Sequence, residues 1–93
     1  MDKLTLLNQV ARYARPAASE DIEILSLDTP LADTNLDSLD MLMISIFLGD
    51  IYGVSEETLK TFQPVTANDI FSFMDVHKTK EPVSVEEAMA SIQ

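Results

Sequence analysis

Apolar residues recur at helical spacing in the first fifteen residues of the chain. Asp2 is placed to cap the start of such a helix, and Pro16 closes it, because proline disfavours helical geometry in the residue before it. The pattern therefore predicts a helix over residues 3–15. Five apolar side chains share one of its faces: Leu4, Leu7, Val10, Ala11 and Ala14.

Residues 16–37 form a long connection, which is unusual in a compact domain unless apolar side chains anchor it. The stretch from Ile22 to Leu27 resembles a short strand, but it has no evident partner strand. We therefore expect an ordered loop with inward-pointing anchors. Six apolar residues are available: Ile22, Ile24, Leu25, Leu27, Leu31 and Leu36.

A nearly uninterrupted apolar run follows Asp37. Asp37 is a good N-cap residue, and the run continues to Tyr52 with Gly49 as its only weak helix former. Gly53 can adopt the left-handed conformation that ends helices. The sequence therefore predicts a helix over residues 38–52.

Two shorter helices follow this one. Ser55 caps a short helix that runs to about Phe62, and Thr66 with Asp69 has the form of a capping box. The helix after Thr66 places four residues on one face: Ile70, Phe73, Met74 and His77. Three longer helices and one short helix predict an all-α fold, a small four-helix bundle over residues 1–77.

Residues 78–93 form a C-terminal extension. Ser84 and Glu87 are spaced as a capping box, and four apolar residues after Ser84 share a face: Val85, Ala88, Met89 and Ile92. A helix of roughly nine residues is marginal unless it packs on something. Two interpretations stay open, a fifth short helix and a frayed tail.

Acidic residues dominate the charge of the chain. The 93 residues carry a net charge of −10, which disfavours nucleic acid and anionic membranes as partners and favours basic protein surfaces. No Lys or Arg occurs between Pro16 and Leu59, a segment with ten acids: Glu20, Asp21, Glu23, Asp28, Asp33, Asp37, Asp40, Asp50, Glu56 and Glu57. An ordinary solvated surface and a docking field are both compatible with this segment.

The chain contains no cysteine, so it has neither a thiol of its own nor a zinc-finger spacing. It opens without the apolar run of a signal peptide, and its longest uncharged stretch, residues 41–49, is shorter than the roughly 20 residues that cross a bilayer. We therefore expect a cytoplasmic, monomeric protein of one domain without a membrane span.

Ser38 falls in the first turn of the predicted helix over residues 38–52. Unpaired backbone N–H groups and the positive end of the helix dipole favour an anion there, so a phosphodiester on the Ser38 oxygen would be partly compensated. The alternative is that Ser38 only helps to start the helix, which is a common role for serine.

The residues around Ser38 resemble the attachment site of the acyl carrier protein family, Leu-Gly-x-Asp-Ser-Leu-Asp. Here the segment reads Thr34-Asn35-Leu36-Asp37-Ser38-Leu39-Asp40, with Asn35 where glycine is common. The likeness extends over about residues 2–77 in helix order, loop length and acidity. It implies that a phosphopantetheinyl transferase attaches 4'-phosphopantetheine from coenzyme A to Ser38, within a motif that Asp37, Leu39 and Asp40 flank.

The resemblance also implies partners, namely acyl-chain synthases, transferases and reductases with basic or mixed basic and apolar patches. Family members usually present several acids on the helix after the serine, whereas here only Asp40 and Asp50 carry charge. Three explanations are open for the apolar surface: a wider acyl pocket, cover by the C-terminal extension, or an apolar partner. Alternatively, these residues simply belong to the core, as apolar helical faces usually do.

The apolar residues of the helix over 38–52 divide into two predicted faces. The 3.6-residue period predicts that Leu39, Leu42, Ile46 and Phe47 face inward. We expect an acyl chain to lie among Leu42, Ile46 and Phe71. Too little polar surface then remains outside, and we expect a docking surface made of four residues: Met41, Met43, Ile44 and Asp50.

Other chemistries fit the sequence poorly. Asp33, Asn35 and Asp37 have the spacing of the first ligands of a calcium loop, but Ser38 and Ile44 stand where glycine and glutamate are needed, so we expect no metal site. The single histidine, His77, has no catalytic partner in sight, and we expect no enzymatic activity.

Two other function classes remain beside an acyl carrier for fatty-acid or polyketide-like synthesis. One is an unmodified acidic helical module for docking or regulation, and the other is a peptidyl or D-alanyl carrier. The sequence leaves open the acyl cargo, the pathway and the transferase.

Overall fold

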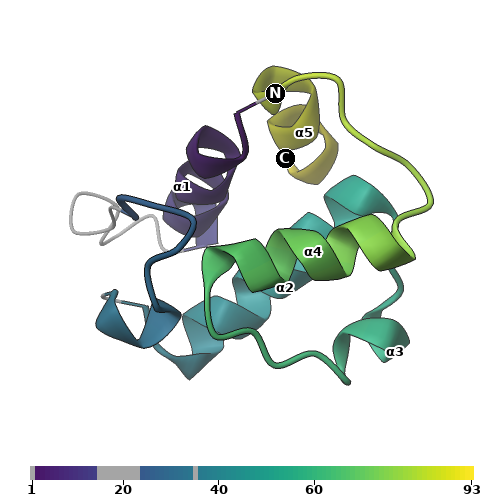
Figure 1. The fold of residues 1–93 in the computed structure, drawn as a ribbon. Coiled ribbons are helices and arrows are strands. Elements are labelled where there is room, and N and C mark those ends of the chain that lie inside the picture. Colours follow the sequence, from purple (N-terminus) through teal and green to yellow (C-terminus); the bar gives the residue numbers. More distant parts are fainter. Residues whose placement is uncertain (1, 15–23, 35) are drawn as a thin grey trace.

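Five α-helices and one short 3-10 turn make up the secondary structure in the computed structural model, which describes residues 2–14, 24–34 and 36–93 (Figure 1). Within those ranges there is no strand, only an isolated β-bridge between Pro30 and Thr66. The all-α class predicted from the sequence is therefore confirmed.

Helix α1 (Lys3–Ala14) begins at Asp2, whose carboxylate accepts hydrogen bonds from the Leu4 N–H at 3.1 Å and the Thr5 hydroxyl at 2.7 Å. The bond from the Leu4 N–H satisfies one of the backbone donors that a helix start leaves free. The residues that follow Ala14 lie outside the described ranges. The described helix therefore ends at Ala14, whereas the predicted helix ends at residue 15. Its inner face is fully buried and consists of Leu6, Leu7, Val10 and Ala11.

The described part of the long connection is held by a side-chain amide. Asn8 accepts the Ile24 N–H at 2.7 Å and donates to the Ile24 carbonyl at 2.9 Å, so both backbone groups of Ile24 are paired with α1. Ile24 and Leu31 are buried, as expected of anchors. Leu25, however, is 75% exposed, so its prediction as an inward anchor is wrong. Ile22 lies outside the described residues.

Leu27 and Leu36 are partly buried against the core and continue the anchoring of this connection. The Leu27 carbonyl accepts the Asn68 N–H at 2.9 Å, and the Leu31 N–H, at the start of the 3-10 turn η2 (Leu31–Asp33), donates to the Val65 carbonyl at 2.8 Å. These bonds hold the connection against the start of α4.

Helix α2 (Ser38–Tyr52) has the predicted bounds and contacts all four other α-helices. Gly53 ends it in the left-handed conformation, with φ of 70°. A helix that is apolar on every side is expected where neighbours cover most of its surface. Cover by the C-terminal extension, one of the three explanations for this apolar helix, therefore contributes, because α5 packs on α2.

The predicted inward face of α2 is partly wrong. Leu39 and Leu42 are 64% and 56% exposed, and Ile46 and Phe47 are half-buried. Helical periodicity distinguishes faces only where polar residues interrupt the pattern, and the apolar run of α2 offers almost none. The residues that the prediction left outside this face and that are buried in the core are Ile44, Leu48 and Ile51.

Helix α3 (Glu56–Leu59) is shorter than the predicted segment, but two three-residue turns carry the helical path on to Phe62. Its cap is Ser55, whose hydroxyl accepts the Thr58 N–H. Gly49 of α2 lies under this helix, since a Cβ at Gly49 would stand 2.7 Å from Cδ1 of Leu59. The small residue therefore permits the close approach of α3 to α2.

Helix α4 (Ala67–His77) starts with the predicted capping box, in which Thr66 and Asp69 each accept the other's backbone N–H. These hydrogen bonds lower the pKa of the Asp69 carboxyl. Of the predicted face, Ile70 and Met74 are buried, whereas Phe73 is half-buried and His77 is exposed.

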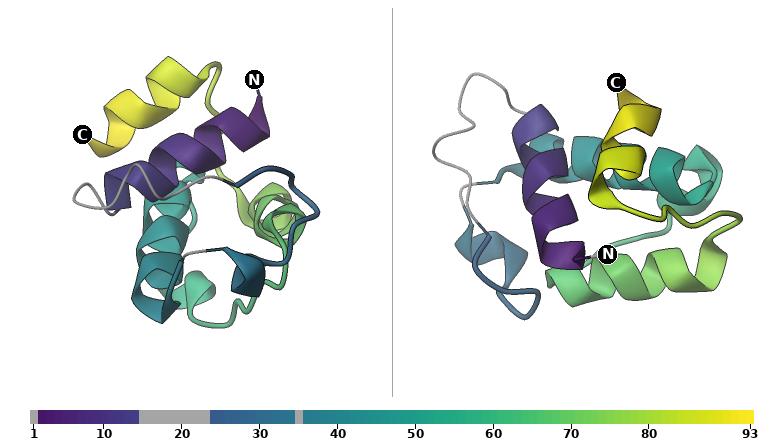
Figure 2. Two further views of the ribbon diagram at one scale, coloured as in Figure 1. Left: turned by 90° about the vertical axis from the view of Figure 1, so that its left-hand side faces the viewer. Right: turned by 90° about the horizontal axis from the view of Figure 1, so that it is seen from above.

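The C-terminal extension contains a fifth helix, α5 (Val85–Ile92), capped by Ser84. Ala88 and Met89 are buried in the same core as α1 and α2. Both views of Figure 2 show α5 beside α1 and running in the same direction. Near their C-terminal ends, the Tyr13 hydroxyl donates to the Ile92 carbonyl at 3.1 Å. Of the two open interpretations, the helix is the one that the structure bears out.

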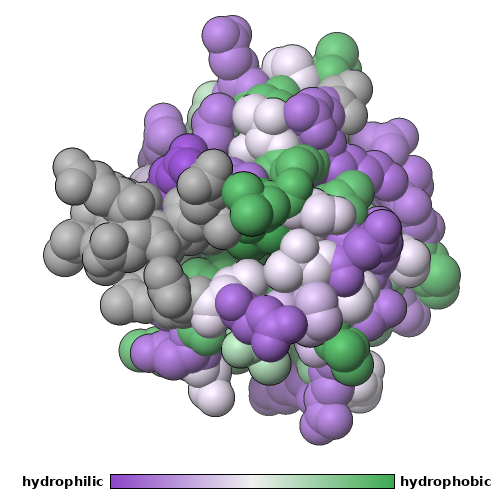
Figure 3. Space-filling model, turned by 60° about the vertical axis from the view of Figure 1, so that its left-hand side comes forward, coloured by the Kyte–Doolittle hydropathy of each residue, from purple (hydrophilic) through white to green (hydrophobic). Residues whose placement is uncertain are grey.

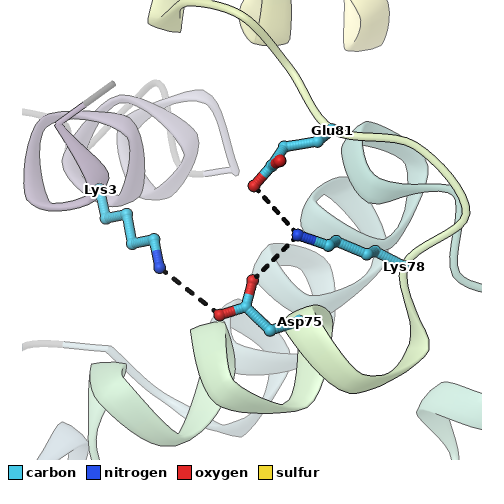
Figure 4. Close-up of polar contacts among 4 residues, drawn as sticks. All are labelled: Lys3, Asp75, Lys78 and Glu81. Atoms are coloured by element: carbon cyan, nitrogen blue, oxygen red, sulfur yellow. Dashed lines mark hydrogen bonds and ion pairs between the residues drawn. The ribbon is translucent and has the colours of Figure 1, made fainter.

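The linker between α4 and α5 closes over the end of α2. The Tyr52 carbonyl accepts the N–H groups of Thr79 and Lys80, and the Thr79 hydroxyl donates to the Gly53 carbonyl at 2.7 Å. Beside these bonds, an exposed chain of ion pairs runs from Lys3 through Asp75 and Lys78 to Glu81 (Figure 4). Exposed pairs of this kind contribute little stability each, but they join α1, α4 and the linker.

Candidate functional site

Ser38 is the first residue of α2, and its side chain is exposed. Asp37 precedes it as the N-cap residue, and the Met41 N–H closes the first turn on the Asp37 carbonyl at 3.0 Å. The Ser38 hydroxyl therefore stands at the positive end of a 15-residue helix and is open to solvent. An anion attached to this oxygen would lie next to the free N–H end of the helix.

The two aspartates of the motif hold the turn around Ser38. The Asp37 carboxylate accepts the Asp40 N–H, and the Asp40 carboxylate accepts the Asp37 N–H, both at 2.9 Å. Asp40 is only 5% exposed, whereas Asp37 is exposed, so this reciprocal pair is partly buried. The pair fixes the backbone on both sides of Ser38 while leaving its hydroxyl uncovered.

Next to Ser38 opens a groove of about 680 Å³. It runs between η2, the first half of α2, α3 and the loop after α3. Its lining is mostly apolar, with polar side chains at intervals: Leu31, Ala32, Leu36, Asp37, Ser38, Met41, Leu42, Ser45, Ile46, Glu56, Leu59, Lys60, Phe62, Gln63 and Pro64. A groove of this size and lining is typical of sites that bind small organic ligands.

Of the three predicted pocket residues, Leu42 and Ile46 line the groove. Phe71 does not line it, and its place in the predicted pocket is a correction. Phe71 is 3% exposed in the core, with its ring edge-on to Tyr52 at 6.5 Å between centroids. The α4 helix turns this ring toward the end of α2, away from the groove.

The predicted docking residues do not form one exposed surface. Ile44 is fully buried, so it is unable to contact a partner, and Met41 lines the groove. Met43 is half-buried, and only Asp50 is fully on the surface. The exposed apolar side chains of α2 are instead Leu39 and Leu42, which flank Ser38 and the groove.

Hydrophobic surface is not confined to α2. Figure 3 shows hydrophobic side chains gathered near the centre of one face, with hydrophilic side chains around them. Large exposed apolar residues also occur far from Ser38 in the chain, among them Leu25, Val65, Val76 and Val83. Exposure alone therefore does not single out a docking surface.

Ten of the fifteen groove residues were not predicted as site residues, among them Ser45, Lys60 and Phe62. Ser45 is the only polar residue between Met41 and Gly49, and this isolation in an apolar run is the signal that identifies it. Lys60 and Phe62 lie after α3, and only the tertiary fold brings them to the same groove as Ser45. Phe62 is held in place by stacking on Phe73, with ring centroids 4.1 Å apart.

The described parts of the chain bear on two further kinds of feature, a metal cluster and a membrane-spanning helix. Within residues 2–14, 24–34 and 36–93, no three potential metal-ligating side chains of His, Cys, Asp or Glu lie together. None of the helices there is both long enough and apolar enough to cross a membrane. His77 is exposed at the end of α4, where its ring contacts Phe73 at 4.5 Å between centroids.

The site thus combines an exposed serine at a helix start, a reciprocal pair of carboxylates that fixes its backbone, and an adjoining apolar groove. Comparison with known proteins adds no assignment, because no family model, no curated protein and no solved structure matches this chain.

Proposed function

We propose that this protein is an acyl carrier that bears 4'-phosphopantetheine on Ser38. The observation that carries the proposal is the position of the Ser38 hydroxyl, exposed at the first residue of α2 and at the mouth of the apolar groove. A tethered chain starting at this oxygen reaches the groove directly. In this proposal residues 1–77, with α1 to α4, form the carrier bundle, and residues 78–93 extend it.

Attachment is a phosphoryl-group substitution carried out by a separate transferase. The Ser38 oxygen attacks the phosphorus that carries pantetheine in coenzyme A and loses its proton to the transferase, while adenosine 3',5'-bisphosphate leaves. The new phosphodiester keeps one negative charge, which the N-terminal end of α2 favours. When bound, the group supplies the thiol that this cysteine-free chain lacks and that carries acyl groups as thioesters.

The chain's own residues hold and shelter this group. Asp37 and Asp40 keep the backbone around Ser38 in one conformation, so the attachment point is presented without rearrangement. Leu42, Ile46 and Leu59 offer apolar surface along the groove for an acyl chain. Burying such a chain contributes about 25 cal/mol for each Å² of apolar surface removed from water.

The proposal extends to partners. The transferase and the acyl-chain synthases, transferases and reductases would present basic surfaces to the acids near Ser38 and apolar surface to Leu39 and Leu42. We propose that the protein works as a cytoplasmic monomer that catalyses nothing itself. Whether its cargo belongs to fatty-acid or polyketide-like synthesis stays open.

The test is incubation with coenzyme A and a phosphopantetheinyl transferase of broad specificity, followed by intact-protein mass spectrometry. We expect a mass gain of one phosphopantetheine group, located on Ser38 by peptide mapping. Ser38→Ala should show no gain, whereas Ser84→Ala, which changes another serine at a helix start, should be modified normally. No gain with any transferase, and a bare Ser38 in protein from its native host, would favour the unmodified docking module.

A further inference from the structure

A buried hydroxyl that pairs with none of the described residues lines the groove. Ser45 is only 8% exposed and lines the groove. Among the residues that the structure describes, none makes a hydrogen bond with its hydroxyl, and the oxygen is not sealed from the groove. Serine in a helix often donates to the carbonyl four residues back, and here that bond is not made. The hydroxyl is therefore free to pair with whatever occupies the groove.

The position of Ser45 along α2 relates it to the attachment point. It follows Ser38 by seven residues, which is close to two helical turns, so the two residues share a side of α2 about 10 Å apart along the axis. Met41 and Leu42 lie between them and also line the groove. The phosphopantetheine arm is longer than this spacing, so it has to fold back over the groove for its acyl chain to lie beside Met41, Leu42 and Ser45.

The opposite wall combines a fixed apolar surface with polar donors. Phe62 and Leu59 form apolar surface, and the stack of Phe62 on Phe73 braces the wall from the side of α4. Lys60 and Gln63 also line the groove, and both residues are exposed and carry polar side chains. Polar residues thus occur both on α2 and in the segment after α3, among lining residues that are mostly apolar.

This arrangement distinguishes two kinds of acyl chain. A plain hydrocarbon chain that fills the groove displaces water from Ser45 and leaves its hydroxyl unpaired, which opposes binding. A chain with an oxygen part-way along pairs with the hydroxyl, which both donates and accepts. We propose that Ser45 makes the groove selective for acyl chains that carry a hydroxyl or keto oxygen, in preference to unsubstituted chains of equal length. This inference rests on the proposed carrier function.

The experiment compares chains of one length on the same tether. Ser38 is loaded by the transferase from hexanoyl, β-hydroxyhexanoyl or β-ketohexanoyl coenzyme A, and complete loading is checked by intact mass. Two quantities are measured: the rate at which hydroxylamine cleaves each thioester, divided by the rate for the matching coenzyme A thioester so that intrinsic reactivity cancels, and the shifts of backbone amide NMR signals along the groove. The first reports burial of the chain, and the second reports where it lies without any enzymatic turnover.

We expect the two oxygen-bearing chains to be cleaved roughly two to ten times more slowly than hexanoyl, the effect of one ordinary hydrogen bond. Their signal shifts should centre on Ser45. In Ser45→Ala the difference between chains should vanish while α2 stays folded by circular dichroism. Ser72→Ala, which removes an exposed hydroxyl on α4, is the matched control and should retain the difference.

Two outcomes overturn the proposal: equal protection of all three chains in the unaltered protein, or a preference for oxygen-bearing chains that survives in Ser45→Ala. A failure of the carrier function itself looks different. In that case no mass gain appears on Ser38 with any of the three donors. The proposed selectivity of the groove for acyl chains is then wrong as well.

Discussion

Asp37 and Asp40 cap each other: each carboxylate accepts the backbone N–H of the other residue at 2.9 Å, with Ser38 between them. Because the two bonds share one turn, they satisfy two helix-start donors and fix the direction in which the serine leaves the helix. The acidic flanks of the motif thus have a structural role within the chain, independent of any partner.

This capping predicts a loss of stability when it is removed. Asp37→Ala should lower the free energy of unfolding by about 1 kcal/mol, which corresponds to roughly 4–8 °C in melting temperature for a domain of this size. Asp37→Ser, which keeps a capping oxygen, should lose less. Asp50→Ala is the control on the same helix, because Asp50 is exposed near its C-terminal end, where an acid is unfavourable. Equal losses for Asp37→Ala and Asp50→Ala would contradict the capping role.

The two glycines of the chain should respond differently to alanine. Gly53 has φ of 70°, and a Cβ there would collide with the Thr79 hydroxyl oxygen, so Gly53→Ala should cost about 1–3 kcal/mol of stability. Gly49→Ala gains helix propensity of about 0.5–1 kcal/mol but pushes against Cδ1 of Leu59, a flexible atom, so its net effect should be smaller. Urea unfolding of both variants measures the difference. A larger loss at Gly49 would show that Leu59 and the Val54 carbonyl do not yield to the added Cβ, and would overturn the predicted order.

The buried phenol of Tyr52 predicts alkaline sensitivity. Burial, with Asp75 and Glu81 nearby, raises the pKa of Tyr52 to about 12. The unfolded chain ionises its tyrosines near pH 10, so between about pH 10 and 12 the unfolded state holds fewer protons and the folded state loses stability as pH rises. Below about pH 10 both states keep the phenol proton, and the stability is fully retained.

The near-ultraviolet absorbance of tyrosinate in a Tyr13→Phe variant isolates this titration, because the chain has only two tyrosines. Tyr52 should ionise late and together with unfolding. Ionisation near pH 10 in the folded protein would place Tyr52 in solvent and contradict its burial.

Crowding of acids predicts that salt stabilises the protein. The net charge of −10 and the absence of bases between Pro16 and Leu59 produce repulsion in the folded state, which added ions screen. The melting temperature should therefore rise with sodium chloride. The exposed ion pairs around Asp75 weaken in salt, but their contribution is small. A melting temperature that stays constant or falls would show that repulsion between the acids does not govern how stability responds to salt.

Packing of α5 predicts that the C-terminal extension contributes to the core. Met89→Ala should lower the free energy of unfolding by about 2 kcal/mol, the lower end for a buried methionine, because Met89 is 8% exposed at the edge of the core. Val83→Ala, at a residue that is 79% exposed, should change little. Chemical denaturation measures the free energy of unfolding of both variants. Equal values would indicate that α5 is a frayed tail that contributes nothing to the core.

Helix ends were the most predictable feature of this chain. Asp37, Ser55, Thr66 and Ser84 cap helices as their side chains indicate, and Gly53 ends α2. Such signals are local, because a cap bonds to backbone two or three residues away. The exposed position of Ser38 beside the capping pair follows from the same local chemistry.

Local sequence patterns predicted neither which residues of α2 are buried nor the existence of the groove. Ile44 is buried and Leu42 is exposed because of where four other helices lie, and no spacing within α2 encodes that. The groove needs Leu31, Leu59 and Phe62 from separate segments to meet opposite α2. Phe71 was misplaced for the same reason, since the direction of its ring depends on how α4 crosses α2.

The position of α2 at the centre of the fold restricts how this protein can be redirected to other enzymes. Besides Ser38, only Leu39, Leu42 and Asp50 of this helix are fully exposed, and each remaining side chain is at least partly engaged by a neighbouring element. Engineering of a new pairing therefore has at most these three positions on this surface, and Leu42 among them also lines the groove. Substitutions at further positions of α2 would disturb the packing that positions Ser38.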